Sequence, residues 1–275
     1  MSTMDIFGMT DKLDEPILGV LVNRLEARGK HPFFLKMLQD YLDAMDIGSA
    51  RTVLDMGCGT GLAARTIALR EGFSGKVVGI DLSPYLTGVA GRLAEEQGVA
   101  NLVEFRTGDI QGLDIPDAEF DAVVAHTLLS HVGNPFAVLK EAARVVKPGG
   151  MVGIFDGDYA SMTFDQENPV KGKADDEIII NALVTNPRVM RQMPRLLRKA
   201  GLELVSVFPY ILAEVGKAEF WASGIDSYFQ LVIKSGMMTE EYMKDWAAGL
   251  VKDSEEGIFF GASNYYGYVA EKIAG

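Results

Sequence analysis

Apolar runs alternate with stretches of helical periodicity from residue 51 to residue 156. Five short apolar runs predict strands that end near residues 55, 81, 106, 126 and 155. The intervening residues 62–70, 85–97 and 135–147 have the spacing of helices, and Ser83-Pro84 and Asn134-Pro135 are typical helix starts. Strands that alternate with helices form a parallel sheet, so the pattern predicts a doubly wound α/β fold.

The second half of the chain has a different pattern. Residues 157–190 contain few periodic signals, and we interpret them as an excursion over the rim of a site. A helix is predicted over about Arg191–Ala200 because Gly201 ends its pattern. Leu202–Leu212 and Phe259–Ile273 are predicted to be antiparallel strands, and Lys217–Val251 between them is predicted to be helical.

These patterns predict one core with helical caps and no internal repeat. Its expected parts are an N-terminal helical arm at 1–50, the core at 51–212 with the rim excursion 157–190, a helical cap insertion at 213–255, and a final core strand at 256–275. The arm looks helical over Pro16–Met45, but the polar group Arg28, Gly29, Lys30 and His31 interrupts its apolar stripe.

A glycine-rich loop follows the first strand and precedes a helix. Gly57, Gly59 and Gly61 alternate there, and Asp55 lies two residues before the first of them. Glycine permits sharp turns and close approach of a ligand to the backbone. A dinucleotide site would use G-x-G-x-x-G and receive a pyrophosphate, which Asp55 would repel. The carboxylate suits a cationic ligand such as S-adenosylmethionine, although such a loop can also serve only as a tight turn.

The segment Asp55–Gly61 has the form D-x-G-x-G-x-G and resembles the first motif of class I S-adenosylmethionine-dependent methyltransferases. The resemblance covers about residues 51–156. It implies a Rossmann-like, mostly parallel seven-stranded sheet with a reversed C-terminal strand, and it places Cys58 beside the cofactor. The segment from His126 to His131, followed by Asn134-Pro135, looks like the ubiquinone and menaquinone biosynthesis methyltransferases.

Two further carboxylates are candidates for cofactor binding. Asp81 ends the second strand, where an acid can accept both ribose hydroxyls, but it could also be an N-terminal acid of the next helix. Asp109 follows the third strand, where the resembled family has an acid that meets the adenine amino group, but it could simply be a turn residue. The neighbours Leu82 and Ile110 are included in the predicted cofactor site.

Methyl transfer from a sulfonium is an in-line displacement that needs positioning and, for some acceptors, proton removal. His126 and His131 flank the loop where the resembled enzymes face the methyl group, and Asp158 and Tyr159 are further candidates for catalysis. His126 is also a predicted cofactor contact, and either histidine could instead be structural. Related enzymes often close the pocket with an N-terminal arm, so Arg28 is a candidate for holding a carboxylate. No metal site is predicted.

Composition limits the setting. The net charge of −12 argues against a nucleic-acid partner, because such a partner requires a concentrated basic surface. Cys58 is the single cysteine, so no intramolecular disulfide can form and a reducing compartment is expected. No apolar run approaches eighteen residues, which predicts no membrane insertion and a cytoplasmic protein. The oligomeric state stays open.

The sequence therefore predicts an S-adenosylmethionine-dependent methyltransferase with a small, apolar or aromatic acceptor. A catalytically silent cofactor-binding partner protein, a dinucleotide-dependent oxidoreductase, and a different transfer or cyclisation remain as alternatives. The caps supply methionine and aromatic side chains that either roof the acceptor or pack in the core. They are Met162, Phe164, Met190, Met193, Trp221, Tyr228, Phe229, Tyr265 and Tyr266.

Overall fold

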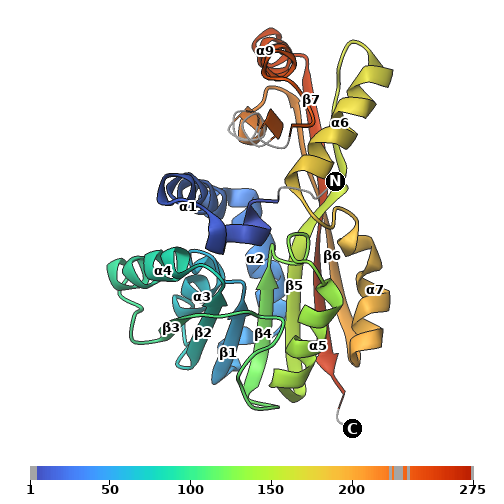
Figure 1. Cartoon of the computed structure of the whole chain (residues 1–275). Coiled ribbons are helices and arrows are strands. Elements are labelled where there is room, and N and C mark those ends of the chain that lie inside the picture. The colour runs from blue at the N-terminus through green and yellow to red at the C-terminus, as the bar shows by residue number, and fades with distance from the viewer. Residues whose placement is uncertain (1–4, 223–224, 226–231, 234–235, 274–275) are drawn as a thin grey trace.

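A seven-stranded sheet forms the centre of the protein (Figure 1). The computed structural model describes residues 5–222, 225, 232–233 and 236–273. The strand order is β3-β2-β1-β4-β5-β7-β6, and β7 runs antiparallel to both of its neighbours. The strands are β1 Thr52–Met56, β2 Lys76–Asp81, β3 Val103–Thr107, β4 Phe120–His126, β5 Val146–Phe164, β6 Leu202–Gly216 and β7 Phe259–Lys272. The predicted mostly parallel sheet with a reversed last strand is confirmed.

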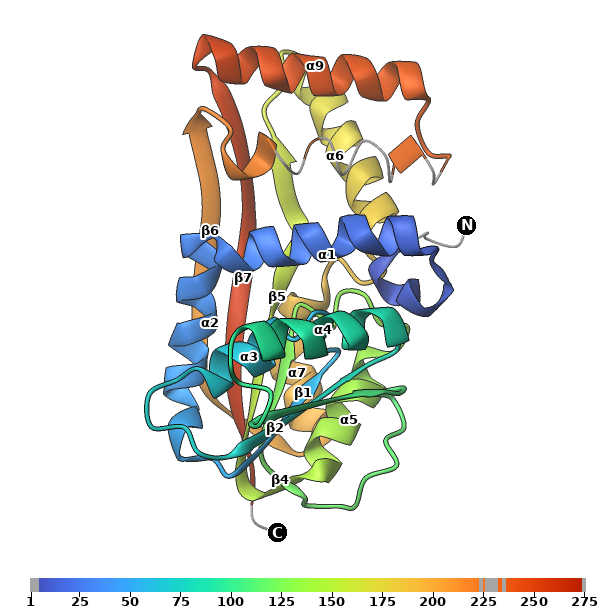
Figure 2. The same ribbon diagram turned by 90° about the vertical axis from the view of Figure 1, so that its left-hand side faces the viewer.

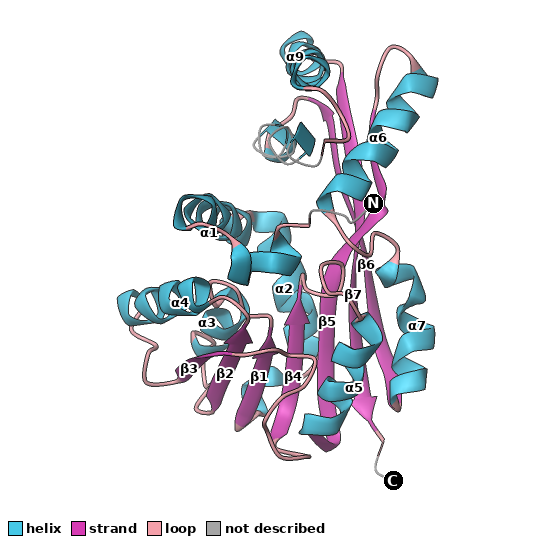
Figure 3. Cartoon of the chain, viewed as in Figure 1, coloured by secondary structure: helices cyan, strands magenta, loops and turns pink. Residues whose placement is uncertain are grey.

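Helices cover both faces of this sheet (Figure 3). Side chains of α2 and α3 belong to one large buried cluster, and those of α5 and α7 belong to another. The helices are η1 Phe7–Lys12, α1 Glu15–Lys30, α2 Pro32–Ala44, η2 Ile47–Ser49, α3 Leu62–Ala68, α4 Pro84–Glu96, α5 Pro135–Val145, α6 Pro169–Leu183, α7 Val189–Ala200 and α9 Glu240–Glu256. Among the described residues, no helix is both long and apolar enough to span a membrane.

The helix starts predicted from the sequence have the expected caps. The Ser83 hydroxyl accepts a hydrogen bond from the backbone of Leu86 at the start of α4. The Asn134 side chain accepts one from Ala137 at the start of α5. Both helices also begin with proline, whose missing N–H costs nothing at that position. Local sequence therefore fixes where these helices leave the rim of the sheet.

The fifth strand is much longer than its apolar run predicts. We expected it to end at Phe155, but β5 continues to Phe164, and α6 occupies much of the segment that lacked periodic signals. The extra length pairs with β7, where Phe164 lies opposite Gly261. Together β5, β6 and β7 extend beyond the other strands and carry α6 and α9 at their far end (Figures 1 and 2).

The N-terminal arm contains two α-helices with a break between them. α1 ends at Lys30 and α2 begins at Pro32, with extended backbone at His31 between them. α1 crosses over the carboxyl ends of the strands beside α4 (Figure 2). Glu26 of α1 binds the Arg65 guanidinium at 2.6 Å and accepts a hydrogen bond from the Thr60 hydroxyl. The arm is therefore fastened to the loop between β1 and α3.

Candidate functional site

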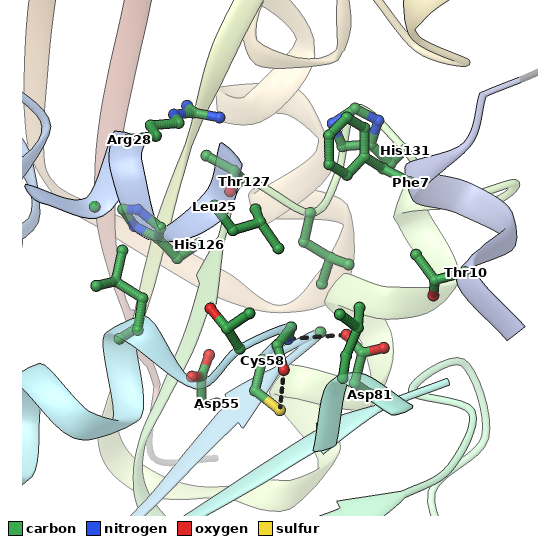
Figure 4. A pocket seen from close by; sticks show the side chains of 18 of the residues that line it. Phe7, Thr10, Leu25, Arg28, Asp55, Cys58, Asp81, His126, Thr127 and His131 are labelled. Carbon is green, nitrogen blue, oxygen red and sulfur yellow. Dashed lines mark hydrogen bonds between the residues drawn. The ribbon is translucent and has the colours of Figure 1, made fainter. Parts of the chain in front are cut away.

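Two cavities lie side by side between the arm and the carboxyl ends of the strands. The inner cavity has a volume of about 90 Å³ and is lined by the β1–α3 loop (Figure 4). The outer cavity has a volume of about 470 Å³ and lies between α1, β5 and β7. The two share wall residues from η1, α1 and the loop after β4, namely Phe7, Leu25, Arg28, Thr127 and His131.

The glycine loop forms the floor of the inner cavity. Gly57, Gly59 and Gly61 all have positive φ, and the N–H groups of Gly57 and Cys58 donate to the Ile80 carbonyl. A Cβ at Gly57 would lie 2.4 Å from a methyl carbon of Leu128, so the position needs glycine for space as well as conformation. Gly57, Cys58 and Gly59 line the cavity, whereas Gly61 lies outside its wall and directly precedes α3.

Asp81 lies at the end of β2 and lines the inner cavity. Its carboxylate accepts hydrogen bonds from the N–H groups of Gly59 and Ser83, both at 2.9 Å. Burial raises the pKa of this carboxyl, while the two backbone donors oppose the change. The side chain therefore fixes the loop and at the same time faces the cavity.

Asp55 is almost completely buried beneath the same loop. Its carboxylate accepts a hydrogen bond from Ala64 in α3 at 3.1 Å. Burial raises the pKa of Asp55 to about 7, and the charge of Asp81 adds to this effect. Burial also raises the pKa of the Cys58 thiol, which is therefore an unreactive small side chain at neutral pH.

Three other predicted cofactor contacts, Leu82, Asp109 and Ile110, lie outside the wall of the inner cavity. Asp109 is exposed, and its carboxylate accepts the N–H of Gln111 in a local turn. Ile110 is buried in the core, and Leu82 is 37% exposed at the end of β2. The turn interpretation of Asp109 thus has direct geometric support, while its adenine role stays a prediction.

His126 ends β4 and lines the inner cavity. Its Nδ1 lies 3.1 Å from the Tyr41 hydroxyl, and its ring stacks on Phe155 at a centroid distance of 4.8 Å. Burial lowers the pKa of His126 to about 3, and the positive charge of Arg28 lowers it further. The imidazole is therefore neutral at pH 7 and only weakly basic.

His131 lines both cavities but has a structural partner. Its Nδ1 lies 3.0 Å from the carboxylate of Asp5, which also accepts hydrogen bonds from the backbone and hydroxyl of Thr185. These contacts join the N-terminal segment to the loop after β4 and to the end of α6. Asp5 was missed in the sequence because nothing local marks a residue 126 positions from its partner.

The side chains of Asp158 and Tyr159, both predicted as catalytic candidates, lie in different surroundings. Tyr159 lines the outer cavity. Asp158 lines neither cavity, because its carboxylate binds the Arg191 guanidinium of α7 at 2.8 Å. Asp156 is fully buried and accepts two hydrogen bonds from Ser130. The structure thus does not bring Asp158 to the site where we expected it.

The cap side chains proposed for the acceptor roof lie mainly in the core. Trp221, Met190 and Met193 are fully buried there, whereas Tyr265 lines the outer cavity together with Phe220, which we did not predict. Tyr228 and Phe229 lie outside the described residues. No group of three or more His, Cys, Asp or Glu side chains placed to hold a metal is present in the described part of the chain.

Part of the chain matches a known protein family. Residues 54–154 match the family described as methyltransferase domain. This region is therefore similar to a methyltransferase domain. The match begins one residue before Asp55 and ends within β5, so it contains the glycine loop, Asp81 and His126. The glycine loop and the reversed last strand, which the resemblance implied, are both present in the structure.

Three curated relatives show how far the similarity extends beyond the methyltransferase domain. An uncharacterized 37.1 kDa protein in a transposon of Streptomyces fradiae is 30% identical over 84% of this chain and 65% of its own length. A sterol 24-C-methyltransferase of Aspergillus fumigatus is 32% identical over 58% of this chain and 42% of its own. A ubiquinone biosynthesis O-methyltransferase of Dechloromonas aromatica is 40% identical over 41% and 47%. The chain thus spans less than two thirds of the length of these relatives.

A solved structure has the same fold. A protein of Bacillus halodurans described as a putative methyltransferase superposes with a TM-score of 0.62 and 20% identity, over 86% of this chain and 99% of its own. At this level of identity the likeness concerns the fold alone.

Proposed function

We propose that the protein transfers a methyl group from S-adenosylmethionine to a small apolar or aromatic acceptor. The observation that carries the proposal is the contact between two cavities of different character. The inner one is built on the glycine loop and two carboxylates, and the outer one has a largely apolar wall. Because both cavities are lined by Thr127 and His131, a ligand in one cavity would lie next to a ligand in the other.

The chemistry of the inner cavity suits this cofactor. Each oxygen of Asp81 accepts one backbone hydrogen bond and has a further lone pair for a ribose hydroxyl. Asp55 offers a buried carboxylate whose ionisation a cationic ligand would favour. The exposed side chain of Leu82 and the acid Asp109 lie where β2 and β3 end, on the side proposed for the adenine. Gly57 and Gly59 leave room for the ligand against the backbone.

S-adenosylmethionine supplies a methyl group already activated on a sulfonium. The chain then has to hold the acceptor in line, exclude water and, for a hydroxyl or acidic carbon, move a proton. α1 and Phe7 line both cavities and can help to exclude water there. The neutral His126 can orient the acceptor by a hydrogen bond, and it remains our candidate for proton removal, although a pKa of about 3 makes it a weak acceptor.

Binding and turnover test the proposal separately. Calorimetric titration should show binding of S-adenosylmethionine and S-adenosylhomocysteine, and NAD should not raise the melting temperature. Incubation with a metabolite extract and methyl-labelled cofactor should give a product that carries the labelled methyl. Cofactor binding with no labelled product from any extract would favour the catalytically silent alternative, and stabilisation by NAD alone would favour the oxidoreductase.

A further inference from the structure

We propose that the outer cavity accepts an apolar molecule that carries an anionic group, and that Arg24 and Arg28 hold this group beside His31. The inference rests on the proposed function, since it names the class of acceptor for the same site. The anionic group belongs to the acceptor. The carboxylate of the cofactor's methionine part has the same chemistry, so the experiment below distinguishes the two.

The wall of the outer cavity concentrates positive charge in a strongly acidic protein. Arg24 and Arg28 both line it, although the chain has a net charge of −12. Glu219 is the acidic residue in this wall, and His131 is held by Asp5. Two guanidinium groups one helical turn apart on α1 therefore face a single cavity. Such a pair attracts an anion.

Arg28 is held in an orientation that suits a carboxylate. Its guanidinium carbon lies 4.4 Å from the ring centre of Phe34 and 5.7 Å from that of Tyr265. Contacts of this kind use the flat face of the group, while its N–H donors project from the edge, where carboxylates bind in bidentate fashion. Figure 4 shows Arg28 on the same side of the cavity as His126. An anion bound there would lie close to the reacting centre.

His31 provides an independent sign of a polar ligand. Its Nδ1 is buried in the wall of the outer cavity and has no hydrogen-bond partner among the residues that the structure describes. The ring is packed against Phe34 and Phe220, at centroid distances of 5.9 and 5.4 Å. A buried polar atom without a partner is rare, because leaving it unpaired costs free energy. A polar atom of a bound ligand would satisfy it.

Most of the remaining wall is apolar. The outer cavity, at about 470 Å³, has room for an organic molecule of modest size. Its hydrophobic side chains come from η1, α1, β5, the end of α6 and β7, and include Phe7, Val20, Leu25, Tyr159, Leu183 and Tyr265. An amphiphile with one charged end therefore matches the wall better than either a neutral hydrocarbon or a highly polar metabolite.

Two fluorescent probes with the same aromatic body test the inference. 8-Anilinonaphthalene-1-sulfonate carries a sulfonate, and N-phenyl-1-naphthylamine is its neutral counterpart. In the presence of saturating S-adenosylhomocysteine, the full chain should bind the anionic probe at least about tenfold more tightly. Arg24→Gln should remove most of this preference without changing the affinity for the neutral probe, and Arg24→Lys should retain part of it. Arg92→Gln, an exposed arginine of α4 outside both cavities, is the matched control.

Several results would overturn the inference. Equal affinity of the wild-type chain for the two probes would do so, and this comparison needs no variant to fold. An equal loss of preference in Arg92→Gln would show a general charge effect. If Arg24→Gln weakened calorimetric binding of S-adenosylhomocysteine but left the probe preference intact, the charge would serve the cofactor. Failure of the wild-type chain to bind S-adenosylhomocysteine would count against the proposed function. The affinities for the two probes could still be compared in the absence of S-adenosylhomocysteine, so the two failures are distinguishable.

Discussion

At the scale of single residues, Asp81 and Asp109 differ although both lie near the carboxyl end of a strand in the same sheet. Asp81 faces the inner cavity, whereas Asp109 closes an exposed turn. We expect Asp81→Ala to weaken S-adenosylmethionine binding by about 1.5–3 kcal/mol, because a charge-assisted hydrogen bond to the ribose is lost. Asp109→Ala is the matched control and should cost less. Calorimetric titration measures both.

A lower affinity for S-adenosylmethionine in an Asp81 variant has to be distinguished from a change in the conformation of the loop between β1 and α3. Asp81→Asn keeps an acceptor for the N–H of Gly59, so it should fold as well as the parent while binding the cofactor less tightly. Unchanged affinity in folded Asp81→Ala would reduce Asp81 to a residue that caps the helix after β2.

His126 is a residue whose role depends on its protonation. With a pKa near 3, below the ordinary value of 6.5, it stays neutral throughout the physiological range. If it orients the acceptor and takes its proton, His126→Ala should lower turnover by roughly 10²–10⁴-fold and leave cofactor affinity nearly unchanged. Its ionisation should also produce no inflection in kcat/KM above pH 5. Turnover within a few-fold of the parent would show that positioning by other groups is sufficient.

At the scale of elements, the loop between β1 and α3 depends on Gly57. Its φ is +66°, and a Cβ at this position would come within 2.4 Å of Leu128. Any side chain at position 57 therefore causes backbone strain and, in addition, a steric clash with Leu128. Gly57→Ala should therefore destabilise the protein by more than the roughly 1–2 kcal/mol of backbone strain alone. Gly72→Ala is the control, because Gly72 has a φ of +80° and open space around it. Equal losses of urea stability in the two variants would show that Leu128 moves aside easily.

The arm depends on a contact between α1 and α3. The Arg65 side chain is only 2% exposed, and Glu26 is its ion-pair partner. We expect Glu26→Ala to cost about 3–5 kcal/mol of unfolding free energy, because a buried charge is left uncompensated. Glu15→Ala, an exposed acid in the first turn of the same helix, should change stability by less than about 0.5 kcal/mol. A small effect at Glu26 in urea unfolding would mean that water or another side chain replaces it.

At the scale of the whole molecule, buried carboxyls make stability depend on pH. Burial raises the pKa of Asp55 from 3.8 to about 7, so the folded chain keeps a proton that the unfolded chain releases. Between these two values unfolding free energy must fall as pH rises. Relative to Asp55→Asn, the wild-type chain should lose roughly 2–3 kcal/mol between pH 5 and pH 8. Urea unfolding at the two pH values measures the difference, and parallel pH profiles for the two proteins would contradict it.

The sequence by itself determined the features that local chemistry controls. Glycine spacing fixed the loop after β1, and apolar runs fixed where β1 to β4 lie. Ser83 and Asn134 fixed the starts of α4 and α5. Parallel strands end at one edge of a sheet, so Asp55, Asp81 and His126 had to lie close together once the alternation was recognised.

Only the tertiary structure decided the rest, because it depends on contacts between distant segments. β5 extends to Phe164 because β7 provides a partner for it, not because its sequence is strongly apolar. Asp5 reaches His131 over 126 positions, which gives that histidine a structural partner. Neighbouring side chains of β5 point to opposite faces of the sheet. Asp158 therefore contacts Arg191, whereas Tyr159 lines the outer cavity. Pairing partners and strand faces are set by the packed chain, and a single segment does not contain that information.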